Sequence, residues 1–131
     1  MSRSYRDLLV GQKARRLAIE VYRATEKFPK SELYGLTSQL RRASVSVVSN
    51  IAEGQGRLTK GEFRHFLGQS RGSLLEMETQ LEIASDLGYV GPACYDLLHQ
   101  QAYEVLGLLN RLLSSLRLPT PSTETVKPVK P

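Results

Sequence analysis

Residues 92–117 read PACYDLLHQQAYEVLGLLNRLLSSLR, and this stretch decides the fold. Its apolar side chains recur without a slip at alternating steps of three and four residues, at Tyr95, Leu98, Ala102, Val105, Leu109, Leu112 and Leu116. That spacing places them on one face of an α-helix roughly 40 Å long. Such a regular seam is typical of helices that pack nearly parallel in a bundle. The sequence therefore predicts a helix over about 92–117, beginning at Gly91-Pro92.

Three earlier segments show the same periodicity and predict helices over about 7–28, 32–54 and 60–87. Their apolar lines are Val10, Ala14, Leu17, Val21, Ala24 and Phe28; Leu33, Leu36, Leu40, Ala43, Val47 and Ile51; and Phe63, Phe66, Ser70, Leu74, Met77, Leu81 and Ala84. The expected boundaries are residues that favour helix ends, namely Pro29, Ser31 as a cap, Gly54 and Gly56 as breaks, Thr59 with Glu62 as a capping box, and Gly88.

Four such helices joined by short turns predict an all-α fold, an antiparallel up-down-up-down four-helix bundle over residues 1–118. No segment between residues 5 and 118 alternates with period two for long, so no strand is expected. Residues 119–131 read PTPSTETVKPVKP and offer little to bury. We expect this proline-rich stretch to be a disordered tail.

Composition indicates one soluble domain. The chain has 131 residues, of which 40% are hydrophobic and 24% charged, enough for a core that needs no disulfide or structural metal. Its single cysteine, Cys94, cannot form an internal bridge and favours a reducing compartment, most simply a bacterial-type cytoplasm. Neither an export signal nor a membrane span is expected, because no apolar stretch approaches the roughly 18 residues that a span needs.

Charge is unevenly placed along the chain. The formal net charge is +5, yet residues 1–72 carry 14 Lys or Arg against 6 Asp or Glu, and residues 73–118 carry 2 against 6. Twelve of the 18 basic residues are arginine, whose planar fork suits phosphate and carboxylate. Two interpretations stay open here. Either the basic half binds a polyanion or an acidic partner, or it pairs with the acidic half within or between subunits.

No catalytic or metal site is predicted. Glu62 with His65 and Asp96 with His99 have the spacing of bundle metal ligands. However, the expected helix reversal near residue 90 would separate the two histidines by about 24 Å along the axis. Neither histidine combines with Cys94 into a set of nucleophile, base and orienting group. We therefore expect no enzymatic activity, no cofactor, no metal and no small-molecule substrate.

A polar line runs along the second predicted helix beside its apolar line. It consists of Gln39, Arg42, Ser46, Asn50 and Glu53 at steps of three and four. The line either faces solvent or forms a hydrogen-bonded groove against another helix, involving Ser73 and Glu76, or against a second subunit.

The candidate phosphate-binding residues are basic side chains of the first three predicted helices. We expect positive charge to concentrate around the turn from the second to the third helix, with few aromatic residues nearby, so that nucleic acid would be held through phosphates and without base stacking. The candidates are Lys13, Arg15, Arg16, Arg41, Arg57, Arg64 and Arg71, with Arg42 beside Arg41.

Several of these residues form a recognisable signature. It comprises Phe28-Pro29, residues 36–43 (LTSQLRRA), Ser46, residues 50–54 (NIAEG) and Arg57, then Phe63, Phe66-Leu67, Gly72-Ser73-Leu74, Glu76 and Leu87-Gly88-Tyr89. Over about residues 5–116 the chain resembles the four-helix-bundle family encoded in intervening sequences of bacterial 23S rRNA genes, also labelled ribosomal protein S23. It is distantly similar to the accessory protein of diversity-generating retroelements.

The resemblance implies a small cytosolic bundle that assembles into a ring of five, and a distant relative that binds nucleic acid. It also singles out Arg42, Ser46, Asn50, Glu53 and Gly54 as matches to the most recognisable family motif. We hypothesise that Arg42 and Glu53 hold the second helix against a neighbouring helix or protomer.

Two functions remain open. One is a homo-oligomeric bundle that binds RNA or DNA through phosphates, and the other is a protein-interaction scaffold with no nucleic-acid role. In both, the first partner is a second copy of the chain, and no membrane partner is expected.

Overall fold

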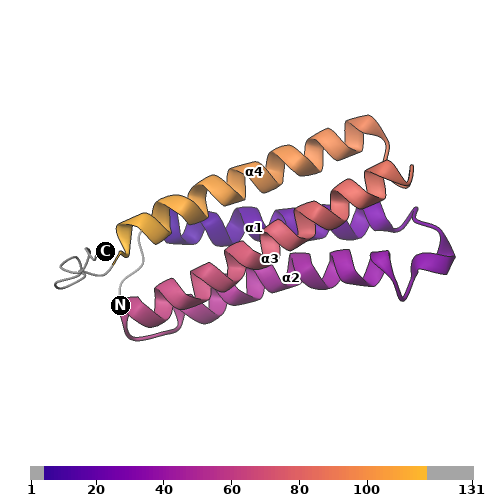
Figure 1. The fold of residues 1–131 in the computed structure, drawn as a ribbon. Coiled ribbons are helices and arrows are strands. Elements are labelled where there is room, and N and C mark those ends of the chain that lie inside the picture. Colours follow the sequence, from indigo (N-terminus) through magenta and orange to yellow (C-terminus); the bar gives the residue numbers. More distant parts are fainter. Residues whose placement is uncertain (1–4, 118–131) are drawn as a thin grey trace, which may run out of the picture.

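The structure, a computed structural model, describes residues 5–117, and the predicted tail lies outside this range. Four α-helices occupy most of it: α1 (Tyr5–Thr25), α2 (Leu36–Gln55), α3 (Lys60–Asp86) and α4 (Pro92–Ser115), with a short 3-10 helix η1 (Lys30–Glu32) before α2. They lie side by side along one long axis (Figure 1). No strand occurs between residues 5 and 117, which confirms the predicted all-α class.

The helices pack around a closed square. The backbones of helices that follow one another in the chain approach closely, and α4 closes back on α1; within the described range the backbones of the diagonal pairs α1–α3 and α2–α4 do not approach this closely. Neighbouring helices run in opposite directions: along each pair, contacts that lie further on in one helix involve residues that lie earlier in the other. On α3 and α4, for example, Arg64 bonds to Leu113, whereas Glu78 contacts His99. This is the expected up-down-up-down bundle.

The core follows most of the predicted apolar lines, but on α3 Leu67 is fully buried whereas Phe66, which was assigned to the line, is only partly buried. The largest fully buried side chains come from all four helices, namely Val10, Leu17, Val21, Leu40, Val47, Ile51, Leu67, Leu74, Met77, Leu81, Leu98 and Leu109. Burial of each such side chain contributes on the order of 2 kcal/mol, so the shared core holds the four helices together. No helix in the described part of the chain is long and apolar enough to cross a lipid bilayer.

Both ends of the α3–α4 connection form as predicted. Gly88 has a positive φ of 81°, and the N–H groups of Gly88 and Tyr89 donate to the carbonyls of Ser85 and Ala84 at 3.0 and 2.9 Å. This is the glycine-dependent helix ending that leaves few carbonyls unpaired. Pro92 begins α4, as the Gly91-Pro92 pair predicted. The start of α3 is also confirmed, because the Thr59 hydroxyl accepts from the Glu62 N–H at 3.1 Å.

The connection from α1 to α2 differs from the prediction. Helix α1 ends at Thr25 rather than at Phe28. Beyond it the N–H groups of Glu26 and Phe28 donate to the carbonyls three residues back, at 3.3 and 3.1 Å, and Pro29 disfavours helical backbone at Phe28. Helix α2 begins at Leu36 rather than near residue 32, and Ser31 does not cap it. Instead the Glu32 carboxylate accepts from the Leu36 N–H at 3.0 Å. The tight turn of η1 thus replaces the first turn expected for this helix.

The side chains around this connection also depart from the predicted pattern. Leu33, assigned to the apolar line, is half exposed, because it precedes the helix instead of lying on its buried face. Phe28 lies beyond the end of α1 but is still buried, and its ring lies 5.4 Å from that of Tyr89. The aromatic pair therefore closes this end of the core.

Gly54 has a different role from the one predicted. It lies within α2, which continues to Gln55, so only Gly56 follows the helix end. A Cβ atom at Gly54 would lie 3.0 Å from atoms of both Phe63 and Phe66 on α3. The glycine is therefore required for the close approach of α2 to α3 and does not act as a helix break.

Candidate nucleic-acid interface

The polar line on α2 is in part a hydrogen-bonded contact with α3. The hydroxyl oxygens of Ser46 and Ser73 lie 2.9 Å apart, and the Asn50 amide donates to the Ser46 carbonyl at 2.9 Å and to its hydroxyl at 3.1 Å. One turn away, the buried Ser70 hydroxyl donates to the Val47 carbonyl at 2.8 Å. The predicted groove between helices is confirmed for Ser46 and Ser73, whereas Asn50 bonds only within α2, and the two bonds that cross between the helices fix the register of α2 against α3.

The remaining members of the line face solvent. Gln39, Arg42 and Glu53 are exposed, as is Glu76 of α3, an expected partner of the line, and Arg42 forms no ion pair within residues 5–117. Glu53 pairs with Arg57, four residues further along. The hypothesis that Arg42 and Glu53 hold α2 against a neighbouring helix of the same chain is wrong, because both side chains point away from the core. Their contact with another protomer stays a prediction.

Three predicted phosphate-binding arginines lie in the half of the bundle nearer the α2–α3 turn, with Arg57 on the α2 side of α3 and Arg64 and Arg71 on its α4 side. Arg57 follows α2, and its guanidinium lies 4.7 Å from the centre of the Phe66 ring on α3. The Nε group of Arg64 donates to the Leu113 carbonyl at 3.3 Å, and that of Arg71 donates to the Asn110 side-chain oxygen at 2.8 Å. The α3 arginines therefore lie against the last turns of α4.

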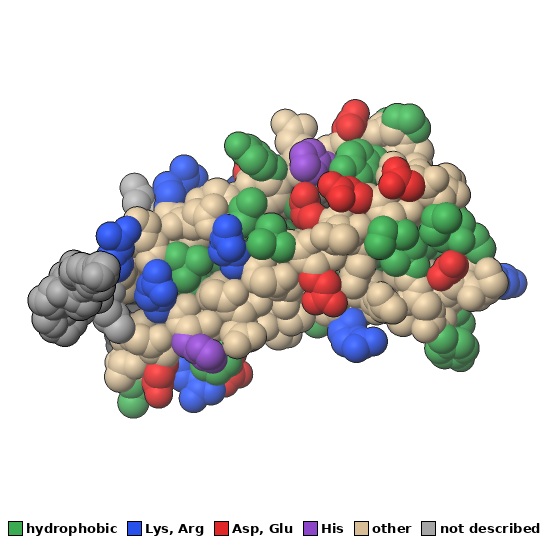
Figure 2. Space-filling view, viewed as in Figure 1, with side chains coloured by type: hydrophobic (Ala, Val, Ile, Leu, Met, Phe, Trp, Pro, Cys, Tyr) green, Lys and Arg blue, Asp and Glu red, His purple; other side chains and the backbone are tan. Residues whose placement is uncertain are grey.

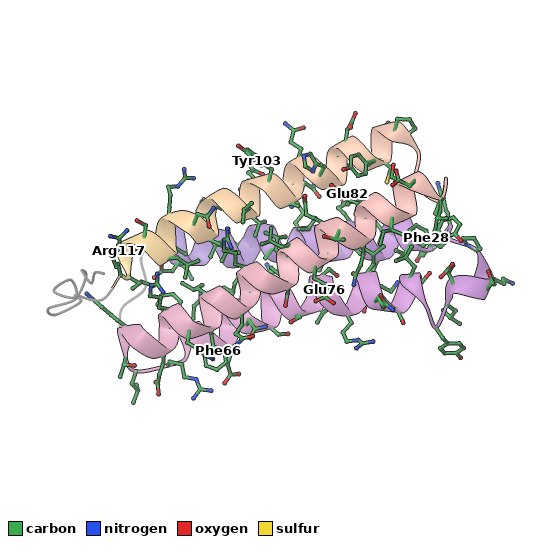
Figure 3. The ribbon with its side chains drawn as sticks, in the orientation of Figure 1. Phe28, Phe66, Glu76, Glu82, Tyr103 and Arg117 are labelled. Atoms are coloured by element: carbon green, nitrogen blue, oxygen red, sulfur yellow. The ribbon has the colours of Figure 1, made fainter. Side chains whose placement is uncertain are left out.

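We call this region the basic end. It lies beside the α2–α3 turn and consists of Arg57, Lys60, Arg64, Arg71, Arg111 and Arg117. Figure 2 shows Lys and Arg side chains gathered over this end of the visible face. In Figure 3, Phe66 and Arg117 lie toward the basic end, whereas Glu82 lies toward the opposite end.

The hydrogen bonds of Arg64 and Arg71 leave their charge uncompensated. Each guanidinium is oriented through Nε by a neutral oxygen, and neither forms an ion pair among the described residues. Their remaining N–H groups are free to donate to an anion, and arginine binds phosphate oxygens best through two such parallel bonds. The site therefore offers pre-positioned donors for phosphate.

The other predicted phosphate-binding residues are not part of this cluster. Arg41 lies 14 residues before the end of α2, about 21 Å along the axis from the turn, so the expectation that it joins the cluster is wrong. On α1, Lys13 pairs with Glu104 of α4 at 3.2 Å, which offsets its charge. Arg15 and Arg16 are exposed farther along α1. The seven candidates thus lie on several surfaces and do not form one site.

Acidic side chains occupy the other half of the α3–α4 face. Burial raises the pKa of the Tyr95 hydroxyl, and the carboxylates of Glu82, Glu78, Asp86 and Asp96 raise it further. We call these four residues the acidic patch; Figure 2 shows Asp and Glu side chains gathered over this half of the face. On this face, positive and negative side chains are therefore separated along the bundle axis. Because α3 and α4 run in opposite directions, the basic start of α3 lies beside the basic end of α4, and the acidic end of α3 beside the acidic start of α4.

A histidine lies within the acidic patch. Nδ1 of His99 lies 3.3 Å from a Glu78 carboxylate oxygen, and the His99 ring stacks on Tyr95 with centres 5.7 Å apart. Burial raises the pKa of Glu78, opposed by the attraction of His99. The second histidine, His65, contacts Phe66 in the basic half of α3. In residues 5–117 no group of three or more His, Cys, Asp or Glu side chains could hold a metal ion.

Aromatic contacts are the part of the surface that the sequence prediction missed. Arg57 lies over Phe66, and the Arg41 guanidinium lies 4.7 Å from the centre of the Tyr22 ring on α1. The expectation of few aromatic side chains near the basic residues is therefore wrong. The contact between Arg41 and Tyr22 arises from antiparallel packing of α1 and α2, and no local sequence signal reports it.

Comparison with known proteins identifies the family. The sequence matches the 23S rRNA-intervening sequence protein family over residues 6–111. Because this match covers most of the chain, the protein belongs to that family, as the resemblance of its motifs indicated. No curated protein matches the chain.

A solved structure supports the fold. The chain is similar to the crystal structure of a protein of unknown function from the S23 ribosomal protein family of Bacteroides thetaiotaomicron. The two share 19% sequence identity and align with a TM-score of 0.77, over 83% of this chain and 98% of the other. The likeness establishes a shared bundle architecture.

Proposed function

We propose that this protein is a non-catalytic, homo-oligomeric bundle that binds RNA or DNA through phosphate contacts at the basic end. The observation that carries the proposal is the state of Arg64 and Arg71, which neutral oxygens hold in place without cancelling their charge. Arginines held in this way lose little side-chain entropy when they bind phosphate. The lone cysteine supports a reducing, cytoplasmic setting for this role.

Binding at the basic end would be largely independent of sequence, because phosphate contacts position a nucleic acid without reading its bases. Each neutralised phosphate releases a condensed counterion, so affinity falls linearly with salt on logarithmic axes. The salt slope therefore counts the contacts, and a variant that lacks part of the basic end must have a smaller slope.

The experiment is a titration of labelled structured RNA and duplex DNA with the full chain across ~50–200 mM salt. The test variant carries Arg57→Ala, Arg64→Ala and Arg71→Ala. The matched control carries Arg23→Ala, Lys27→Ala and Lys30→Ala, which removes the same charge near the opposite end of the bundle. We expect the test variant to bind more weakly and to lose up to about one unit of slope per arginine.

The control decides whether the location of the charge matters. If both triple variants weaken binding equally, net charge alone is responsible and the basic end is not the site. If the wild-type protein binds neither nucleic acid at the lowest salt, the alternative function, a protein-interaction scaffold, replaces the proposal.

Self-association forms the second part of the proposal. Apolar side chains are exposed beside the acidic patch, among them Ile83, Leu87 and Leu97, and such groups favour protein contacts. Contacts at this end would leave the basic end accessible, and symmetry would multiply its charge. The family resemblance suggests five copies.

Light scattering tests the assembly. We expect Ile83→Asp with Leu87→Asp to lower the mass of the oligomer, whereas Leu58→Asp, at an exposed position beside the α2–α3 turn, leaves it unchanged. A wild-type chain that is monomeric at all concentrations would contradict self-association.

A further inference from the structure

A groove lies on the far half of the bundle from the basic end, where the end of α1 meets the beginning of α2. It has a volume of about 730 Å³, within the range of ligand sites, and is lined by Tyr22, Leu33, Tyr34, Arg41, Arg42 and Val45 together with serine and threonine hydroxyls. Among the described residues, the two arginines are its only charged lining residues. We call it the tyrosine groove.

Arg41 is fixed in the groove by neutral groups. Its Nε donates to the Thr25 hydroxyl at 2.8 Å, a terminal nitrogen donates to the Tyr22 carbonyl at 3.3 Å, and the guanidinium lies over the Tyr22 ring. Like Arg42, it has no ion pair within residues 5–117. The groove thus carries two uncompensated positive charges beside an aromatic ring.

Tyr34 provides a second ring. It lies between η1 and α2 and is 91% exposed, so both faces of its ring are open to solvent. Leu33 and Val45, also partly exposed, add apolar surface to the same groove. An aromatic ring this exposed offers a flat apolar face on which a ligand ring can stack.

We propose that the tyrosine groove binds single-stranded nucleic acid, with unpaired bases stacking on Tyr34 and Tyr22 and phosphates contacting Arg41 and Arg42. Each nucleotide presents one flat base and one negative charge, and the groove is lined by two rings and two guanidinium groups that can receive them. A duplex cannot use the rings, because its bases are already stacked and paired. This interface is separate from the basic end and goes beyond phosphate binding there.

The test compares two probes that differ only in their bases. A fluorescein-labelled oligothymidylate and an abasic oligodeoxynucleotide of the same length are titrated with the full chain, and binding is followed by anisotropy. We expect Tyr34→Ala to weaken oligothymidylate binding about fivefold or more without changing abasic binding. Tyr34→Phe, which keeps the ring, should retain wild-type affinity. Arg42→Ala should weaken binding of both probes.

The matched control is Tyr103→Ala, which removes a tyrosine that is 70% exposed on α4, outside the groove. We expect it to leave both affinities unchanged. Equal oligothymidylate affinity of the wild type and Tyr34→Ala would overturn the proposal, as would equal wild-type binding of the two probes. A lower oligomer mass for Tyr34→Ala would also overturn it, because the groove would then hold a second copy of the chain.

The outcomes also separate this inference from the proposed function. Duplex binding that depends on Arg57, Arg64 and Arg71 while Tyr34→Ala binds oligothymidylate normally would retain the basic end and exclude the groove. A base-dependent loss on Tyr34→Ala with no duplex binding would do the reverse.

Discussion

The hydroxyl oxygens of Ser46 on α2 and Ser73 on α3 lie 2.9 Å apart, and Asn50 donates to the carbonyl and hydroxyl of Ser46. Twenty-seven residues separate the two serines, so only the packed hairpin of α2 and α3 brings them together. Polar atoms held between helices are costly when unpaired, which makes this contact specific for one register. It links a polar line visible in the sequence to the alignment of two helices.

The first prediction concerns this contact. Ser46→Ala and Ser73→Ala should each lower the free energy of unfolding by about 1 kcal/mol, since each leaves a partly buried hydroxyl without its partner. The double variant should lose less than the sum of the two, by about 0.5 kcal/mol or more. Urea unfolding measures all three, with the exposed Ser49→Ala as control. Strict additivity would show that the two serines do not interact.

The second prediction compares two helical glycines. Gly54→Ala should destabilise the bundle by about 1–3 kcal/mol, because its Cβ would press on Phe63 and Phe66. Gly68→Ala, where a Cβ meets nothing within 4 Å, should instead stabilise α3 by up to about 1 kcal/mol. Thermal unfolding distinguishes the two signs. Stabilisation by both substitutions would mean that α2 does not need glycine to approach α3.

The third prediction separates two neighbouring arginines. Arg41→Ala should lower the free energy of unfolding by about 1–2 kcal/mol, since it removes hydrogen bonds and a ring contact to α1. Arg42→Ala should change it by less than about 0.5 kcal/mol, because Arg42 is exposed. Equal losses would contradict the structure. Light scattering on the same Arg42→Ala protein tests the hypothesis that this residue joins protomers, which an unchanged oligomer would exclude.

Periodicity and helix-end residues were sufficient to predict most of the fold. The line from Tyr95 to Leu116 predicted the buried face of α4, and Thr59, Gly88 and Pro92 predicted the right boundaries, because each acts on the backbone next to it: Thr59 by a hydrogen bond, Gly88 by its positive φ and Pro92 by its fixed φ. The start of α2 was missed for the opposite reason. There the Glu32 carboxylate, on the preceding 3-10 helix, accepts the hydrogen bond of the Leu36 N–H in the first turn of α2. Local helix propensity does not predict which residue provides this cap.

The candidate sites were predicted less completely. Arg57, Arg64 and Arg71 could be grouped, because two of them lie on α3 seven residues, or about two turns, apart and the third precedes that helix closely. The Arg41–Tyr22 contact and the exposure of Tyr34 could not, because both depend on how the α1–α2 connection folds. Glycine at position 54 was interpreted as a helix break, since sequence alone does not show the facing Phe63 and Phe66.

The fourth prediction concerns pH. Burial raises the pKa of Glu78 in the folded chain, so its carboxyl binds a proton more tightly there than in the unfolded chain. The tighter proton binding stabilises the folded chain at low pH, and this stabilisation is lost as the pH rises from the unfolded-state pKa, about 4.3, through the higher folded-state pKa. Glu78→Gln removes this pH-dependent contribution to the free energy of unfolding. Its Tm should therefore equal that of the wild type at low pH and exceed it at neutral pH.

Melting curves between pH 4 and 8 measure this difference, with Glu82→Gln as a control that removes one negative charge from an exposed position of the same patch. A Tm of Glu78→Gln below that of the wild type at neutral pH would show that the contact with His99 outweighs the burial of the carboxylate.

The opposite placement of the basic end and the acidic patch gives the α3–α4 face an electric dipole parallel to the bundle axis. In the electric field of a polyanion, this dipole would rotate the protein so that the end carrying the α2–α3 connection faces the polyanion before contact. More encounters then begin in the binding orientation than random tumbling would provide. Salt shortens the range of that field to about 10 Å at 0.1 M, so the association rate should depend on ionic strength more steeply than the dissociation rate does.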